Sequence, residues 1–126
     1  MREQALLAGR RILVVEDEAL IALMIRDLLA EMGATVIGPA GTVAEALALV
    51  TSERLDGAIL DYRLPDGTSR SVADALAARN VPFFFASGYD PNSIDRRYTQ
   101  TPKLSKVFDR GELLEMVVSV LGRRPA

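Results

Sequence analysis

Five short apolar runs recur along this chain, and segments with apolar residues at helical spacing separate most of them. The runs cover residues 12–15, 35–38, 55–61, 81–86 and 103–108, and the helical segments cover 19–32, 42–50, 71–79 and 109–121. Strands and helices in strict alternation require right-handed crossovers and a parallel sheet covered on both faces. The pattern therefore predicts an α/β fold built on a doubly wound, five-stranded parallel sheet.

Two of the expected helices begin with a capping box. Thr42 is followed three residues later by Glu45, and Asp109 is followed by Glu112. The polar stretch 90–100 contains a proline and little periodicity, so only a weak fourth helix or a loop is expected there.

The third run leads into a carboxylate and then a turn. Residues 57–60 are apolar and suit a strand buried on both faces, and Asp61 follows them directly. The turn-forming residues Pro65, Asp66 and Gly67 come next. Asp61 should therefore lie at the carboxyl end of a central strand, where open α/β sheets bind their ligands. A simple turn or helix-capping role for Asp61 is the alternative.

Reactive side chains lie at or near the ends of four of the five runs: Glu16, Asp17, Asp61, Ser87 and Lys106. In a parallel sheet these ends share one edge, so three acids, a hydroxyl and an ammonium should meet there. Carboxylates without histidine or cysteine suit a hard cation such as Mg²⁺. A lysine and a hydroxyl opposite such a site suit a phosphoryl group, and a carboxylate can be its acceptor. Each residue alone could be a helix cap, a turn residue or a solvated lysine, and only their joint placement favours a site.

Composition excludes several classes of function. The 126 residues contain no cysteine and no histidine, which rules out disulfides, thiolate or imidazole metal ligands and Ser-His-Asp catalysis. The net charge of −2 comes without a basic cluster, so nucleic acid is not an expected partner. No apolar run is long enough to cross a membrane and no signal peptide is evident, so we expect a cytoplasmic protein. One domain is expected over residues 10–122, with a lead at 1–9 and a tail at 123–126.

The motifs together resemble the receiver domains of bacterial response regulators, which act in two-component signalling. The resemblance runs from about residue 10 to residue 122, and its motifs are residues 14–18, 59–67 and 85–89 together with Lys106. It implies the flavodoxin-like (βα)5 fold of receivers with strand order 2-1-3-4-5. It also implies that Asp61 is the phosphoacceptor.

The resemblance further implies a Mg²⁺ site. Asp17 matches the residue that binds the ion directly, and Glu16 matches the one that acts mostly through water. The backbone carbonyl of Arg63 matches the remaining protein ligand. Ser87 matches the switch hydroxyl and Lys106 the phosphate-binding lysine.

Two positions depart from the usual receiver pattern, and a third indicates a subset of the family. Val107 stands where the family usually has a proline after the lysine, so we expect a trans peptide there. Lys103 stands where the family has a switch aromatic on the fifth strand. The motif at 85–89, which ends in Tyr89, resembles that of the receiver subset named for its Phe-Ala-Thr-Gly motif and known mainly from alphaproteobacteria. Ser87 replaces the threonine of that motif.

The resemblance predicts a stand-alone receiver, a signalling domain and not an enzyme in the usual sense. It would accept its phosphoryl group from a histidine kinase or a histidine phosphotransfer protein and then bind an unidentified protein partner or act as a phosphate shuttle or sink. One alternative is a haloacid-dehalogenase-like phosphatase, which needs a second Asp at the position of Arg63. Another is a degenerate receiver that only binds proteins, which Val107 keeps open.

Two expectations concern how the phosphorylated form behaves. Bulky Arg63 and Tyr89 should shield the phosphoryl group from water and lengthen its lifetime. Lys103 should stay near solvent, so the phosphorylation signal should travel through residues 87–101. Within it, the stretch 90–100 has few apolar residues, Ile94 and Tyr98, and little packing is expected from them.

Overall fold

The computed structural model describes residues 6–87, 98, 101–105 and 108–122. Seven strands and four helices lie in this part of the chain. The strands are β1 (Arg11–Val15), β2 (Thr35–Ala40), β3 (Gly57–Leu60), β4 (Arg63–Leu64), β5 (Gly67–Thr68), β6 (Phe83–Ser87) and β7 (Lys103–Ser105). The helices are α1 (Ala19–Glu31), α2 (Val43–Ser52), α3 (Arg70–Ala78) and α4 (Arg110–Leu121). The predicted weak helix at 90–100 falls almost entirely outside the described residues.

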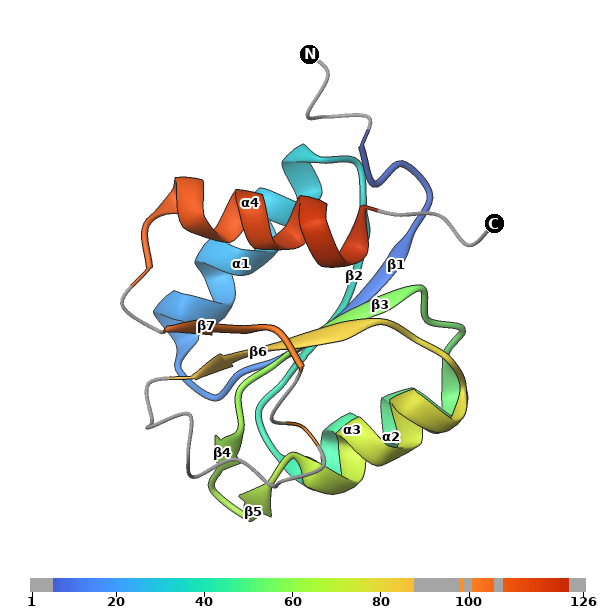
Figure 1. Ribbon diagram of the computed structural model, residues 1–126. Coiled ribbons are helices and arrows are strands. Elements are labelled where there is room, and N and C mark those ends of the chain that lie inside the picture. The colour runs from blue at the N-terminus through green and yellow to red at the C-terminus, as the bar shows by residue number, and fades with distance from the viewer. Residues whose placement is uncertain (1–5, 88–97, 99–100, 106–107, 123–126) are drawn as a thin grey trace.

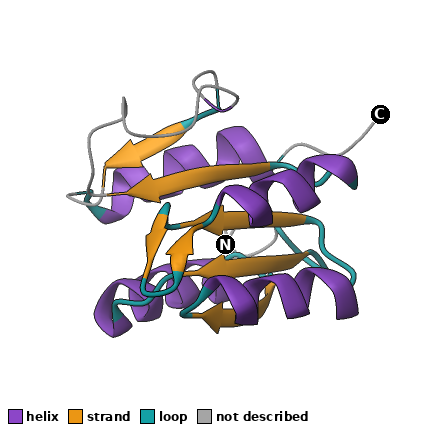
Figure 2. Cartoon of the chain, turned by 90° about the horizontal axis from the view of Figure 1, so that it is seen from below, coloured by secondary structure: helices purple, strands orange, loops and turns teal. Residues whose placement is uncertain are grey.

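The main sheet confirms the predicted α/β architecture. Its five strands are parallel and follow the order β2-β1-β3-β6-β7, which is the expected 2-1-3-4-5 once the small β4–β5 hairpin is set aside. Helices α1 and α4 cover one face and α2 and α3 cover the other (Figure 1). Figure 2 views the molecule from below Figure 1, the side on which α2 and α3 lie, and shows the strands of the sheet side by side.

Two apolar clusters hold these layers together, one on each face of the sheet. Strand β3 is buried along its whole length, because its alternate residues enter opposite clusters. The three consecutive phenylalanines of β6 behave similarly: Phe84 faces the α1–α4 layer, while Phe83 and Phe85 face the α2–α3 layer. Leu7 is fully buried against α1 and α4, so the packed part of the chain begins before residue 10.

The helix caps follow the sequence closely. At α4 both arms of the predicted capping box are present between Asp109 and Glu112. At α2 the hydroxyl of Thr42 accepts a hydrogen bond from the Glu45 amide at 3.1 Å. The returning arm differs, because the Glu45 carboxylate accepts hydrogen bonds from the Gly41 amide and the Thr42 hydroxyl instead of the Thr42 amide.

Strand β2 runs farther than the sequence suggested. The sequence predicted a strand over 35–38, but β2 continues to Ala40, which pairs with Val15 across a register irregularity. A proline is tolerated at this position because β2 is an edge strand and needs no donor on its outer side.

The β4–β5 hairpin was not expected. Arg63 pairs with Thr68 and Leu64 with Gly67 in antiparallel register, so residues flanking the predicted turn at 65–67 form a small ribbon. Its base is closed by a hydrogen bond from the Ser69 amide to the Tyr62 carbonyl at 2.8 Å.

Tyr98 packs more tightly than its polar surroundings suggested. It is 6% exposed, its ring contacts Phe83 and Phe85 edge to face, and its hydroxyl donates to Asp74. The expectation of little packing from Tyr98 was therefore wrong, because the phenylalanines of β6 offer it an apolar slot.

Lys103 is partly buried and keeps part of its contact with solvent. Its ammonium donates to the carbonyls of Tyr98 and Thr101, each at 2.8 Å, and these replace part of its water shell. Burial nevertheless lowers the pKa of Lys103 from its usual value.

Candidate metal centre

The register of the sheet brings two carboxylates to the same edge. Val15 at the end of β1 pairs with Leu60 at the end of β3, so Glu16 and Asp61 both follow directly after paired residues. The Asp61 amide donates to the Val15 carbonyl at 2.8 Å, and the Glu16 amide donates to the Ala40 carbonyl at 2.9 Å. Both residues are therefore fixed by backbone hydrogen bonds that extend the ladders of the sheet.

Glu16, Asp17 and Asp61 converge on one point. A carboxylate oxygen from each lies within 4.8 Å of the others, and no other group of potential ligands of this kind occurs among the described residues. Glu16 and Asp61 are 3% and 2% exposed, while Asp17 is open to solvent. Buried carboxylates this close together require a compensating positive charge. An all-oxygen donor set with one open side fits a hard cation such as Mg²⁺ that keeps some of its water.

The helix-capping alternative for the acidic run is partly right. The Glu16 carboxylate accepts a hydrogen bond from the Glu18 amide at 3.0 Å, just before α1 begins. The Glu18 side chain makes no capping hydrogen bond, although Glu18 is the N-cap residue. Capping thus accounts for one contact of Glu16 and leaves the convergence of the three acids unexplained.

Asp17 borders two surface hollows. One, of about 280 Å³, is lined by Asp17, Glu16 and residues of α1 and the β2–α2 loop. The other, of about 470 Å³, lies between Asp17 and the β4–β5 hairpin, including Arg63. The cluster is therefore accessible from the side on which α1 begins and from the side of the hairpin.

The other candidate residues are placed to different degrees. Ser87 is the last residue of β6, which lies beside β3, and its backbone pairs with Ser105. It therefore ends its strand at the same edge as Asp61. Arg63 is exposed on β4, two residues after Asp61. Lys106, Val107 and Tyr89 lie outside the described residues.

Sequence reasoning missed the contacts of Asp66, in the hairpin that lies beside this edge. Its carboxylate accepts hydrogen bonds from the amides of Val43 at 2.7 Å and Ala44 at 3.2 Å, at the start of α2. The hydrogen bond from Val43 holds the pKa of Asp66 below its usual value. The sequence signals only a turn here, because nothing local relates a turn residue to a helix 22 residues away.

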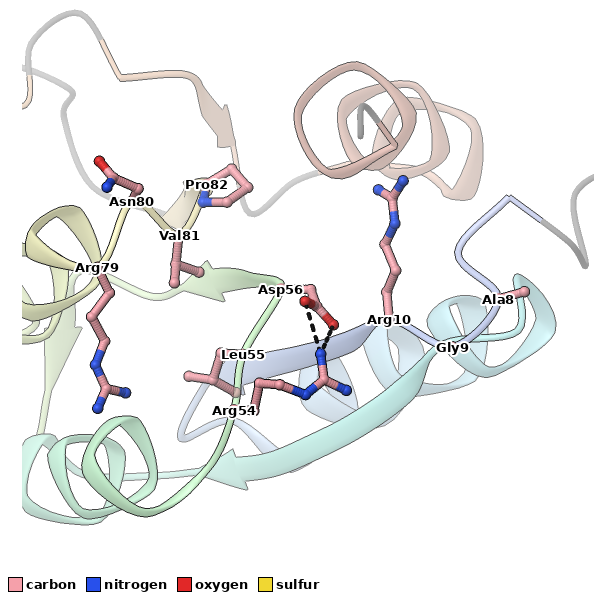
Figure 3. Close-up of a pocket in the computed structure, with 10 residues that line it drawn as sticks. All are labelled: Ala8, Gly9, Arg10, Arg54, Leu55, Asp56, Arg79, Asn80, Val81 and Pro82. Atoms are coloured by element: carbon pink, nitrogen blue, oxygen red, sulfur yellow. Dashed lines mark hydrogen bonds and ion pairs between the residues drawn. The ribbon is translucent and has the colours of Figure 1, made fainter. Parts of the chain in front are cut away.

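Another cavity lies at the opposite, amino edge of the sheet (Figure 3). Its volume is about 510 Å³ and three arginines line it, but their guanidinium groups point apart. Arg10 donates to the Leu121 carbonyl at the end of α4, Arg79 donates to the Val50 carbonyl in the last turn of α2, and Arg54 pairs with Asp56 at 3.1 Å. This cavity therefore lacks the convergence of polar groups that marks the carboxyl edge.

None of the helices in the described part of the chain combines the length and hydropathy that a bilayer crossing needs.

Comparison with known proteins identifies relatives of this arrangement. The family model described as the response regulator receiver domain matches residues 12–118. The phyllosphere-induced regulator PhyR of Methylorubrum extorquens is 38% identical over 91 residues, covering 70% of this chain and 34% of PhyR. The chain spans about a third of the length of the curated relatives it matches.

Two solved structures are especially informative. SdrG from Pseudomonas melonis Fr1, in its BeF3-activated conformation, is 43% identical with a TM-score of 0.74, covering 89% of this chain and 96% of SdrG. The response regulator TrrA of Thermotoga maritima, in complex with Mg²⁺ and BeF, is 27% identical with a TM-score of 0.76, covering 87% of this chain and 97% of TrrA. The similarity to PhyR and SdrG is consistent with the alphaproteobacterial subset suggested by residues 85–89.

Proposed function

This chain belongs to the family of response regulator receiver domains, and on that premise we propose that it accepts a phosphoryl group on Asp61 in a Mg²⁺-dependent reaction. Receivers are signalling domains and not enzymes in the usual sense. The observation that carries the proposal is the convergence of Glu16, Asp17 and Asp61 at the carboxyl edge of the sheet. The proposed phosphodonor is a histidine kinase or a histidine phosphotransfer protein.

In the proposed reaction an oxygen of the Asp61 carboxylate attacks phosphorus. An O–P bond forms while the N–P bond of a phosphohistidine breaks, and the electron pair of that bond returns to the imidazole nitrogen. Bound Mg²⁺ would neutralise charge on the phosphoryl oxygens. Glu16 and Asp17 would hold the ion together with Asp61, and the Arg63 carbonyl is the remaining proposed protein ligand.

The family pattern assigns two further contacts. Lys106 is proposed to bind a phosphoryl oxygen through its ammonium, and Ser87 is proposed to donate its hydroxyl to another. The position of Ser87 at the end of β6, next to β3, supports the second assignment. We take residues 10–122 as the unit that carries these groups, acting in the cytoplasm.

A labelling experiment tests the acceptor. The protein is incubated with Mg²⁺ and acetyl phosphate, and the intact mass is measured before and after hydroxylamine, which cleaves acyl phosphates. The unmodified protein should gain one phosphate that hydroxylamine removes, and Asp61→Asn should gain none. Asp56→Asn is the matched control, since Asp56 lies directly before β3 at the amino edge, whereas Asp61 lies directly after β3. Full labelling of Asp61→Asn would refute the assignment.

The exposed face of α1 is the proposed docking surface for the phosphodonor. Leu20, Leu23 and Met24 are 82%, 42% and 37% exposed, although they are apolar. They line a groove of about 430 Å³ between α1 and α4, and Leu23 also lines the hollow that contains Glu16 and Asp17. An apolar surface continuous with the site suits a helix of the donor that brings its histidine to Asp61.

A charge placed in this groove separates docking from chemistry. Leu20→Asp should slow transfer from a histidine phosphotransfer protein while leaving labelling by acetyl phosphate unchanged. Val118→Asp is the control, because Val118 is an apolar residue of α4 that is 38% exposed and does not line the groove. Equal transfer to both variants would place the docking surface elsewhere.

We further propose that phosphorylation is reported to a downstream protein through residues 87–101. Tyr98 packs on Phe85 of β6, two residues before Ser87, so a shift at the end of β6 is mechanically connected to this segment. Lys103 occupies the position of the usual switch aromatic and holds the carbonyls of Tyr98 and Thr101. Backbone amide NMR with beryllofluoride should show large changes in 87–101, and changes confined to β7 would refute the route.

Shielding of the phosphoryl group is the last part of the proposal. Arg63 and Tyr89 are proposed to obstruct the water that would hydrolyse it. The exposed position of Arg63, beside the hollow that borders Asp17, supports such a role for its side chain. If Arg63→Ala combined with Tyr89→Ala leaves the dephosphorylation rate unchanged, shielding is the wrong explanation.

A further inference from the structure

Helix α2 has two kinds of N-terminal cap, one local and one remote. Thr42 and Glu45 form the local cap, which serves the amides of Glu45 and Gly41. The amides of Val43 and Ala44 instead donate to the carboxylate of Asp66. The first amides of a helix lack partners within the helix, so α2 uses both caps to satisfy them.

The remote cap adds a polar link between the β4–β5 hairpin and α2, which also share an apolar cluster through Leu64 and Ala46. Asp66 lies at the tip of the β4–β5 hairpin, whose strands have only two residues each. A hairpin this short has little stability of its own. Buried Leu64 and Tyr62 anchor its base, and Asp66 is the residue that attaches its tip to α2.

The two joined segments flank the acidic cluster. A methyl group placed on Gly41, just before α2, would lie 3.8 Å from the Cα of Asp17. On the other side, the hairpin and Asp17 line the same hollow, to which Arg63 contributes. Asp66 therefore connects two segments that border Asp17, which are the loop at Gly41 before α2 and the β4–β5 hairpin.

We propose that Asp66 is a positioning residue for the acidic cluster, because its carboxylate fixes the hairpin that carries Arg63 against the loop that packs on Asp17. The cluster's own residues come from two loops of the sheet edge, one after β1 and one after β3, and this link makes two of the surrounding segments move together. The proposal extends the Mg²⁺ site proposed above to a residue that does not touch the ion.

Three variants separate positioning from helix stability. Asp66→Ala removes the remote cap, and Asp66→Asn keeps one acceptor oxygen. Thr42→Ala removes the local cap of the same helix without touching the hairpin. Each variant is measured for stability by urea unfolding, for Mg²⁺ affinity by isothermal titration calorimetry, and for hydrogen exchange of the Ser69 amide, which closes the hairpin on the Tyr62 carbonyl.

Asp66→Ala should weaken Mg²⁺ binding roughly three- to tenfold, less than the 10–100-fold typical of residues that contact a metal ligand directly. It should also speed exchange at the Ser69 amide, and Asp66→Asn should recover part of both losses. Thr42→Ala should lose comparable stability but leave Mg²⁺ affinity and Ser69 exchange near those of the unmodified protein.

Equal effects of Asp66→Ala and Thr42→Ala on Mg²⁺ affinity would overturn the proposal, since helix stability alone would explain them. Unchanged Ser69 exchange in Asp66→Ala would overturn it as well. If the unmodified protein binds no Mg²⁺ while Ser69 exchange still responds only to Asp66, the proposed metal function fails and the structural link remains. The two failures are therefore distinguishable.

Discussion

The two edges of the parallel sheet use charge in opposite ways. At the carboxyl edge, a carboxylate oxygen from each of Glu16, Asp17 and Asp61 lies within 4.8 Å of the others. At the amino edge three arginines line a larger cavity, but each is committed to a backbone carbonyl or a carboxylate of its own (Figure 3). Convergence of like charges, not cavity size, therefore distinguishes a place for a ligand from a place where charges stabilise the fold.

The difference follows from backbone polarity. Helices α2 and α4 end at the amino edge, so their last carbonyls face it and attract guanidinium groups from Arg79 and Arg10. Strands β1 and β3 end at the carboxyl edge, where their following residues continue the ladder as Glu16 and Asp61. The fold itself thus assigns the stabilising arginines and the convergent acids to opposite ends.

The largest expected contrast between the edges is in Mg²⁺ affinity. Asp17→Asn should abolish most binding, because it removes the exposed carboxylate of the cluster and its charge. Arg54→Met, at the other edge, should leave the affinity unchanged, because the Arg54–Asp56 pair is far along the strands from the cluster. Titration calorimetry with Mg²⁺ measures both. Binding retained in Asp17→Asn would show that the acids do not act together.

A smaller contrast is expected within the amino edge. Arg79→Met keeps the alkyl stem but removes the hydrogen bond to the Val50 carbonyl, and should cost about 1 kcal/mol of unfolding free energy. Arg54→Met removes only an exposed ion pair and should cost about 0–0.5 kcal/mol. Urea unfolding compares them, and an equal loss would mean that capping of α2 by Arg79 contributes nothing beyond surface charge.

These contrasts also show what the sequence could and could not predict. The helices and the meeting of Glu16, Asp17 and Asp61 follow from strong periodicity and from the rule that parallel strands end together, whereas the strand order was implied by the resemblance to receiver domains. The β4–β5 hairpin could not be predicted, because two-residue strands carry no periodic signal. Its connection to α2 through Asp66 is equally invisible, since a turn residue gives no indication of a distant helix.

The burial of Tyr98 was missed for a related reason. Its neighbours in sequence are polar, and the segment has weak periodicity, so local pattern indicated a surface loop. Its packing is decided by Phe83 and Phe85, which come from a strand and present an apolar face to it. Phe83 and Phe85 of β6 also pack in the apolar cluster on the α2–α3 face of the sheet. They therefore hold Tyr98, a residue of the segment proposed to report phosphorylation.

The smallest expected effect concerns pH and the carboxyl edge alone. The amides of Val43 and Ala44 favour the ionised form of Asp66, so its pKa in the folded state lies below the ordinary value of 3.8. A carboxyl group whose pKa is lowered by folding stabilises the protein above its unfolded-state pKa, and this contribution is lost as the pH falls through the folded-state pKa. The stability advantage of the unmodified protein over Asp66→Asn should therefore be constant at neutral pH and shrink below about pH 4.

Glu45 also lies in the first turn of α2, but it is present in both proteins and cancels in the comparison. Urea unfolding of the pair across this range measures the difference. An advantage that persists unchanged into acid would mean that hydrogen-bond geometry, and not the charge of Asp66, attaches the hairpin to α2.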